Sequence, residues 1–283
     1  MAEIRPRAES ETNAKMESTL SQGLQLIKPH LVEAWDLETD SPKFAFTSMI
    51  WEANGEFYHH EHDQPEFEIT PDAIGELSKK AVLISHDYYL GKLPAAPATC
   101  ARTTSLSDSN IYFKKITPFT YRLGERHLPA HDLAHEMEVC EKLKNHHHPN
   151  ICRYLGYVPT TDGSHLLGLC FERHETSLVR AAENKREFDA STVIEGISCG
   201  LKHLHSLRYV HNDMNPHNVV LAKNNTPVII DVDSCHEIGA SLKGKKAGTI
   251  DRDHKNQFSE PANEFYGLQQ MREWLIRLVM QRS

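Results

Sequence analysis

Apolar residues recur every three or four positions in three segments of the second half of the chain, a spacing that predicts amphipathic helices over 131–145, 190–207 and 262–281. On the last of these, the expected core-facing positions are Phe265, Leu268, Leu275, Leu278 and Val279. Short apolar runs rich in β-branched and aromatic residues predict strands over 111–116, 151–158, 165–171, 218–222 and 227–233. The order strand, helix, strands, helix, hairpin, helix predicts a mixed α/β fold.

The first hundred residues follow a different pattern. Residues 1–43 are polar with a weakly amphipathic middle, which predicts a frayed extension with one helix. Two strands within 44–60 flank Asn54-Gly55, a dipeptide typical of a hairpin turn. A helix is expected from Pro71 to about Ile84, with Thr70 as its cap. A stretch rich in Pro, Ser and Thr then separates 1–100 from 101–283, the boundary that we predict between an N-terminal extension and the main domain.

The charge balance of the chain limits the classes of macromolecule that it is expected to bind. The chain has 31 basic and 39 acidic side chains, a formal net charge of -8, which argues against nucleic acids or acidic membranes as main partners. Scattered cysteines without CxxC spacing favour a reducing compartment, so we expect a cytoplasmic or, alternatively, a nuclear protein. No apolar run reaches the roughly 20 residues that a membrane helix needs.

The segment 209–235 holds the residues with the clearest chemistry. Asp213 follows a predicted helix, Asn218 comes five residues later, and Asp231 ends a predicted apolar strand. A hairpin that brings two carboxylates and an amide together suits a nucleotide-phosphate site. One carboxylate can accept a hydroxyl proton, while the amide and the second carboxylate offer the hard oxygen ligands that Mg²⁺ prefers.

The sequence HNDMNPHN at 211–218 resembles the catalytic loop of the protein-kinase-like superfamily, and IIDVD at 229–233 lies where that superfamily has its DFG motif. The nearest likeness is to small fungal kinase-like proteins with an HND loop and a DFD-type metal motif. Upstream, Lys114 in IYFKKI stands at the position of the strand lysine, with Lys115 as the less favoured candidate. Glu136 begins a segment that matches the superfamily's helix glutamate.

The resemblance implies a two-lobe protein-kinase-like fold of α/β (α+β) class: a small sheet lobe with one helix, and a shortened, mainly helical large lobe. It implies ATP and Mg²⁺ as cofactors and a protein substrate with a serine or threonine acceptor. Asp213 and Asn218 would be catalytic residues. Lys114, Glu136 and Asp231 would bind the nucleotide, and Asn218 and Asp231 would hold the metal. Glu264 stands where the central helix of the large lobe usually has an aspartate.

Departures from the superfamily pattern leave alternatives open. No GxGxxG precedes Lys114, and Asn212 and Asn215 replace an arginine and a lysine of the catalytic loop. A pseudokinase that serves as a binding or scaffold module is therefore one alternative, and a small-molecule kinase is another. The remote alternative is a zinc hydrolase, because HDLAH at 131–135 has the histidine spacing of a zinc helix.

Overall fold

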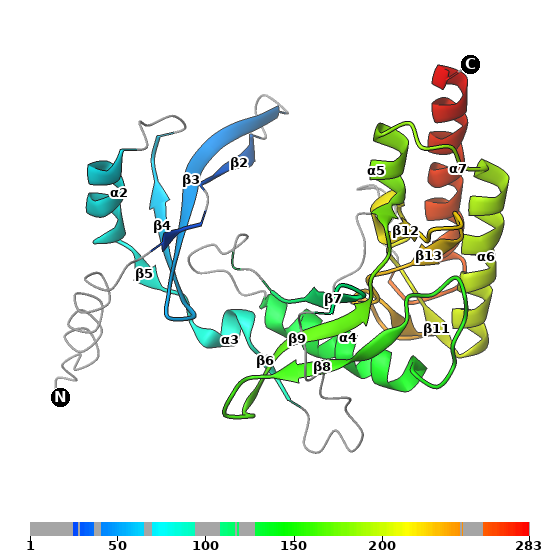
Figure 1. Cartoon of the computed structure of the whole chain (residues 1–283), viewed down its shortest axis with the longest axis horizontal. Coiled ribbons are helices and arrows are strands. Elements are labelled where there is room, and N and C mark those ends of the chain that lie inside the picture. Colours follow the sequence, from blue (N-terminus) through cyan, green and yellow to red (C-terminus); the bar gives the residue numbers. More distant parts are fainter. Residues whose placement is uncertain are drawn as a thin grey trace. The chain divides into compact units, whose positions relative to one another are not determined.

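The computed structural model describes residues 25–27, 29–36, 41–64, 70–93, 108–116, 118, 128–243, 245 and 257–282 (Figure 1). The chain divides into two compact units, of which the first comprises Met1–Tyr89 and Thr117–Leu128, and the second Leu90–Ile116 and Pro129–Ser283. The boundary that we expect near residue 100 falls in a part of the chain that the structure does not describe, and it stays a prediction.

The first unit is built on a five-stranded antiparallel sheet. Its strands are β1 (Gln25–Leu26), β2 (His30–Asp36), β3 (Ser41–Ala53), β4 (Glu56–His62) and β5 (Val82–Leu83), and they are ordered β1-β3-β4-β5 with β2 also paired to β3. The predicted hairpin is confirmed: Asn54 and Gly55 both have positive φ, of 53° and 79°, as a tight turn between twisted strands requires. The helix expected within 1–43 is wrong for 30–36, because these residues pair along β3 instead.

The described part of this unit has two short helices. Helix α2 (Pro71–Ser78) starts at the predicted cap, where the Thr70 hydroxyl accepts from the backbone N–H of Ala73. It ends well before the predicted Ile84, because the chain turns and pairs with β4 through β5. A four-residue helix, α3 (His86–Tyr89), follows. The apolar core of the unit lies under the sheet and consists of Met49, Trp51, Ala53, Tyr58, Leu77 and Ala81.

The second unit begins with a small sheet lobe. A four-stranded sheet of β6 (Gly91–Lys92), β7 (Ile111–Lys114), β8 (Tyr154–Pro159) and β9 (His165–Glu172) carries helix α4 (Pro129–Leu143), whose inner face holds Leu133, Met137 and Cys140 as predicted. Strand β9 pairs with β7 so that Leu169 stands opposite Lys114. A Cβ on Gly168 would lie 2.5 Å from the Lys114 carbonyl oxygen, so glycine is required for this close approach.

The large lobe follows in the same unit. Its helices are α5 (Leu178–Glu183), α6 (Ala190–Ser206), η2 (Pro216–Asn218) and α7 (Asn263–Arg282), and its strands are β10 (Thr176–Ser177), β11 (Tyr209–Val210), β12 (Val219–Leu221), β13 (Pro227–Ile229) and β14 (His236–Glu237). Helices α6 and α7 pack side by side (Figure 1). Asp189 is the N-cap of α6, since its carboxylate accepts from the Thr192 N–H at 2.6 Å. Strands β12 and β13 form the predicted hairpin.

The predicted core face of α7 is confirmed at Leu275, which is buried, and at Leu268, which packs against the core, but it is wrong at Phe265, which is 73% exposed. Met271, which was not predicted, is also buried. Glu264 takes an inward position on the same face as Met271 and Leu275, and its carboxylate is buried against the loop that holds Asp213. A search for apolar residues alone passes over an inward-facing glutamate, which explains the error.

One continuous apolar core joins the small and large lobes of the second unit. It includes Leu133 and Met137 of α4, Ile197 and Leu204 of α6, and Met271 of α7. The expected two-lobe α/β fold, a small sheet lobe with one helix and a mainly helical large lobe, is therefore present. No helix within the described ranges has the length and apolar character to span a membrane.

Candidate active site

A lysine of the small lobe is held between carboxylates of both lobes. Lys114 Nζ lies 2.7 Å from Glu136 Oε2 on α4 and 2.7 Å from Asp231 Oδ1, which follows β13. A third carboxylate, Asp233 Oδ2, is 3.9 Å away. The structure thus brings together three residues that lie 22 and 95 positions apart in the sequence and that the sequence analysis assigned to nucleotide binding. The neighbouring Lys115 forms no ion pair with this group among the described residues.

Burial and charge compete at this lysine. Burial alone lowers the pKa of Lys114, but the neighbouring carboxylates outweigh it and raise that pKa above its ordinary value, so the side chain stays an ammonium ion. Burial raises the pKa of Glu136 to about 7, against the opposing effect of Lys114. Glu136 is fully buried, and neither of its carboxylate oxygens meets hydrogen-bond geometry with the described residues. Lys114 therefore holds Glu136 mainly by charge at short range.

Two amides hold the carboxylate of Asp213. Asn215 Nδ2 donates to Asp213 Oδ1 at 3.1 Å, and Asn218 Nδ2 donates to Asp213 Oδ2 at 2.9 Å. Both amides also donate to the Asp213 backbone carbonyl. The Asn215 Oδ1 accepts from the His217 N–H at 2.9 Å, which fixes which end of the amide faces Asp213. The carboxylate is thus oriented by two donors that are themselves held by the loop.

The same loop fixes the chain just before Asp231. The Ile230 N–H donates to the Asn218 carbonyl oxygen at 3.0 Å, and His211 Nε2 lies 3.1 Å from the Ile230 carbonyl oxygen. The Asp213 N–H donates to His211 Nδ1, so the proton of this imidazole must be on Nε2, which donates to Ile230. Asp231 itself has a φ of 63°, a left-handed conformation. The loop therefore sets the position of both carboxylates.

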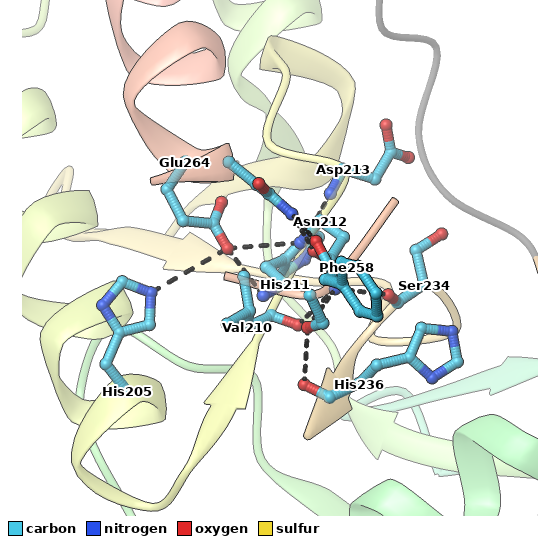
Figure 2. A network of polar contacts seen from close by, with 11 residues as sticks. His205, Val210, His211, Asn212, Asp213, Ser234, His236, Phe258 and Glu264 are labelled. Atoms are coloured by element: carbon cyan, nitrogen blue, oxygen red, sulfur yellow. Dashed lines mark hydrogen bonds and ion pairs between the residues drawn. The ribbon is translucent and has the colours of Figure 1, made fainter. Parts of the chain in front are cut away.

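A buried network anchors this loop to the start of α7 (Figure 2). Glu264 Oε1 accepts from the backbone N–H groups of His211 and Asn212 at 2.6 and 3.2 Å. The Asn212 side chain, only 3% exposed, donates to the Ser259 hydroxyl at 3.0 Å and to the carbonyl oxygens of Val210 and Ser234. Its Oδ1 accepts from Asn263 Nδ2. An uncharged side chain thus ties the loop to the segment that follows Asp231–Asp233.

Two cavities of the second unit adjoin these residues. One, of about 370 Å³, is lined by Lys114, Glu136 and Asp231 together with Phe171, Glu172 and Arg173. A volume of this size lies in the usual range for a small-molecule site. The other, of about 380 Å³, is lined by Asp213, Asn215 and Asn218 and by residues of α7. The charged cluster and Asp213 thus face separate spaces.

The donor set suits a divalent cation that also binds phosphate. Asp231 offers carboxylate oxygens, and the side-chain hydrogen bonds of Asn218 all leave from Nδ2, so its Oδ1 remains as a ligand. Mg²⁺ typically takes one or two such protein oxygens and completes its shell with water and phosphate oxygens. The described residues contain no group of three or more His, Cys, Asp or Glu side chains arranged to hold a metal ion.

The HDLAH segment lacks the geometry of a zinc site. His135 Nε2 lies 2.8 Å from the Cys235 carbonyl oxygen, so that nitrogen carries a proton and donates a hydrogen bond. This leaves only Nδ1 of His135 to bind a metal, and the described residues hold no group of three or more His, Cys, Asp or Glu side chains that could complete a zinc site. The zinc hydrolase alternative therefore has no support in the described part of the chain. His131 and His135 are instead part of α4, the helix that carries Glu136.

Sequence reasoning missed several polar residues around Asp213. In the sequence analysis, Asn215 and Asn212 count only as positions where a lysine and an arginine of the superfamily pattern are missing. In the structure, both side chains make specific hydrogen bonds. Asn263, Tyr266 and Gln270 of α7 went unnoticed. The spacing of Asn215 from Asp213 was a usable signal, because an asparagine two residues after an aspartate can return to it in a tight turn.

Comparison with known families decides the class of this site. Residues 98–252, more than half of the chain, match the family model of the protein kinase domain. The chain belongs to the protein kinase family. The ion pair between a strand lysine and a helix glutamate, and the ordered loop with Asp213 and Asn218, are in keeping with this membership. The Gly248-Thr249 pair expected at the end of the kinase activation segment lies outside the described residues.

Relatives of this kinase-family chain include proteins named as serine/threonine-protein kinases and one named as an inactive kinase. A serine/threonine-protein kinase/endoribonuclease IRE1 of Hypocrea jecorina is 33% identical over 36% of this chain and 10% of that protein. The inactive serine/threonine-protein kinase PLK5 of Mus musculus is 26% identical over 54% and 25%. The serine/threonine-protein kinase PSK1 of Saccharomyces cerevisiae is 27% identical over 41% and 9%. This chain thus spans a quarter or less of each relative.

Proposed function

We propose that this kinase-family protein transfers the γ-phosphoryl group of ATP to a hydroxyl group in a Mg²⁺-dependent reaction. The observation that carries the proposal is the pair of contacts at Lys114, 2.7 Å from both Glu136 and Asp231, next to a loop that orients Asp213 and Asn218. Kinase names among the relatives favour the hydroxyl of a serine or threonine in a protein. The same site could serve a small-molecule acceptor.

The residues take the following parts in the proposed mechanism. Lys114, kept charged and in place by Glu136, orients the phosphates in the cavity that both residues line. Asp231 and Asn218 would hold Mg²⁺, which would supply positive charge beside the phosphates. Asp213, held by two amides, orients the acceptor hydroxyl and accepts its proton. The hydroxyl oxygen bonds to the γ-phosphorus, the bond to the β-phosphate oxygen breaks, and ADP leaves.

This site lacks two cations of the family pattern, a lysine and an arginine of the catalytic loop. Asn215 replaces a lysine near the transferred phosphate, and its amide contacts Asp213 instead. Lys114 and the metal therefore carry the stabilisation of the phosphates. Because Asn212 fills the place of the arginine with a neutral, buried hydrogen-bonding group, we propose that order in this loop does not depend on an activation-loop phosphate.

Turnover of ATP with Mg²⁺ by the wild-type protein and by Asp213→Asn tests the proposal. A pseudokinase is the second candidate, favoured by the missing glycine-rich loop and by the inactive relative from mouse. Thermal stabilisation by ATP, with and without Mg²⁺, identifies a pseudokinase that still binds nucleotide: it gains stability but shows no turnover above the Asp213→Asn background.

Three further expectations belong to this proposal. Its nearest group is the small fungal kinase-like proteins with an HND loop, given the HND at 211–213. The kinase domain occupies 101–283, with the sheet unit of the first hundred residues as an extension. The protein acts in the cytoplasm or the nucleus on a protein or small-molecule acceptor, and neither nucleic acids nor membranes are its partners, in line with its net charge of -8.

A further inference from the structure

A cavity of about 380 Å³ lies against Asp213 on the side of α7. Helix α7 approaches the catalytic loop very closely at one edge of this cavity, where a Cβ on Gly267 would lie 2.3 Å from the Met214 carbonyl oxygen. The polar residues of its lining are Asn212, Asp213, Asn215, His217, Asn218, Asn263, Tyr266 and Gln270. The catalytic loop and α7 thus enclose a space with Asp213 in its wall.

The lining has a distinct chemistry. Five carboxamides, those of Asn212, Asn215, Asn218, Asn263 and Gln270, contribute to it. The Nδ2 groups of the four asparagines already donate within the protein, so the lining offers a ligand mainly amide oxygens and the amide of Gln270. These groups suit a neutral polar ligand with hydrogen-bond donors. Among the described residues that line this cavity, Asp213 is the only aspartate, glutamate, lysine or arginine. Apart from Asp213, whose carboxylate is engaged with the reacting hydroxyl in the proposed mechanism, the described lining has no Asp, Glu, Lys or Arg side chain that could pair with a charged group of a ligand.

The position of the cavity suits the acceptor rather than the nucleotide. Asn218 lines this cavity, and its backbone carbonyl also accepts from the Ile230 N–H, next to Asp231 in the cavity with Lys114. Asn218 therefore stands between the two spaces. A phosphoryl group held on the side of Lys114 and Asp231 would meet a hydroxyl that enters from the side of Asp213.

We propose that this amide-lined cavity is the acceptor site and that it takes a hydroxyl group surrounded by uncharged polar groups. A serine or threonine in a neutral polar peptide and a free polyol share this chemistry. A charged group beside the hydroxyl would lose water without gaining a partner, which disfavours acidic or basic neighbours. The inference rests on the proposed phosphotransfer and adds the class of acceptor to it.

Two adjacent glutamines of α7 provide a matched pair of variants. Gln270 lines the cavity. Gln269 is also exposed but lies on another face of α7, where its Nε2 donates to Glu273 Oε1 at 3.1 Å. Gln270→Lys and Gln269→Lys have the same composition and net charge, but only the first places its ammonium at the acceptor cavity. In the second, the ammonium stands beside Glu273. Gln270→Glu reverses the sign of the charge at the same position.

The experiment compares serine peptides with neutral, acidic and basic flanks, together with glycerol and glucose, as phosphate acceptors. Wild-type protein is expected to use neutral peptides or polyols with kcat/KM at least about tenfold above charged peptides, the factor that an unpaired buried group costs. Gln270→Lys should raise the ratio for acidic over neutral peptides about two- to fivefold, as expected for a partly exposed ion pair. Gln270→Glu should raise the ratio of kcat/KM for basic over neutral peptides, and Gln269→Lys should leave both ratios unchanged.

The same assays identify the kind of acceptor. Phosphate transfer to a polyol but not to peptides identifies a small-molecule acceptor, and transfer to peptides but not to polyols identifies a protein acceptor.

A binding measurement with the same acceptors separates this inference from the proposed function. Broadening of the acceptor's NMR lines on addition of protein reports binding. If the protein transfers no phosphate but binds neutral acceptors, and if the Gln270 variants change the acceptor preference while Gln269→Lys does not, the phosphotransferase is refuted and the acceptor site is supported. Wild-type preference for charged peptides, or equal responses of the two lysine variants, overturns the inference. Absence of binding for every acceptor tested also overturns it.

Discussion

Asn215 donates a hydrogen bond from its amide nitrogen to one carboxylate oxygen of Asp213, at 3.1 Å, while the amide oxygen of Asn215 accepts from the His217 N–H. The residue that replaces a lysine of the family pattern is thus engaged with the proposed base itself. It acts as a positioning residue, because it contacts Asp213 and is not required to touch the reacting groups.

Asn215→Asp tests this positioning role with a side chain of the same shape. The new carboxylate can still accept from His217 but cannot donate to Asp213, and it places two carboxylates about 3 Å apart. We expect kcat to fall at least about tenfold, which corresponds to about 1.4 kcal/mol of lost transition-state stabilisation. KM for ATP should stay unchanged, because the nucleotide cavity has no contribution from Asn215. A parallel rise in KM for ATP, or unchanged kcat, would contradict the role.

Restoring the family's cations at Asn212 and Asn215 should change the free energy of unfolding by different amounts. Asn212→Arg forces a cation into a site where the native side chain is 3% exposed and bonded to carbonyl oxygens and the Ser259 hydroxyl. We expect a loss of about 2 kcal/mol or more in the free energy of unfolding, because the larger, charged group has no room and no carboxylate is bonded to this side chain. Chemical denaturation measures the loss.

Asn215→Lys is the control for that substitution. Its position is partly exposed, and the long lysine side chain can reach water. The free energy of unfolding should change by less than about 1 kcal/mol. Equal losses for the two variants would show that Asn212 holds no special place in the buried network.

Lys114→Met should destabilise the nucleotide-free protein. The substitution leaves the carboxylate of Glu136, which is fully buried, without its ammonium partner. The loss of one partner from a buried pair costs about 3 kcal/mol. The double variant Lys114→Met with Glu136→Leu should recover part of this stability, since it removes the buried Glu136 carboxylate, although Asp231 and the buried Asp233 still lack the Lys114 ammonium. It should not regain stabilisation by Mg-ATP. Recovery of nucleotide binding by the double variant would refute the assigned role of Lys114.

The raised pKa of Glu136 predicts a specific dependence of stability on pH. Burial raises this pKa from 4.5 to about 7 in the folded protein, so between these values the folded state binds the proton more tightly than the unfolded state. The contribution is fully present below pH 4.5 and is lost as the pH rises through about 7. Relative to Glu136→Gln, the wild-type melting temperature should therefore fall between pH 5 and pH 7.5. Parallel pH curves for the two proteins would contradict the assignment.

The charged cluster of the site was predictable because its residues stand in short motifs with a characteristic order and spacing along the chain. Lys114, Glu136 and Asp231 meet as the sequence suggested, and their hairpins and helices have strong local signals. The roles of Asn212 and Asn215 were not predictable, since a comparison with a family pattern registers only the cation that is absent. Their hydrogen bonds depend on the path of the loop, which only the three-dimensional structure supplies.

The errors in the fold have similar physical origins. Residues 30–36 carry an ambiguous apolar pattern, and pairing with a long neighbouring strand decides their conformation against the helix predicted there. On α7, the buried carboxylate of Glu264 sets the inward face, and Phe265 is exposed as a result. Tertiary hydrogen bonds outweigh local periodicity in both places, so no window of sequence contains the deciding information.

The most direct test of the phosphotransferase is the rate of ATP turnover with Mg²⁺ by the wild-type protein, Asp213→Asn and Asp231→Asn. Both substitutions keep the size of the side chain and remove a negative charge. We expect wild-type turnover to exceed that of each variant by at least about a hundredfold, as is usual for the loss of a base or of a metal ligand. Equal background rates for all three proteins would contradict the account.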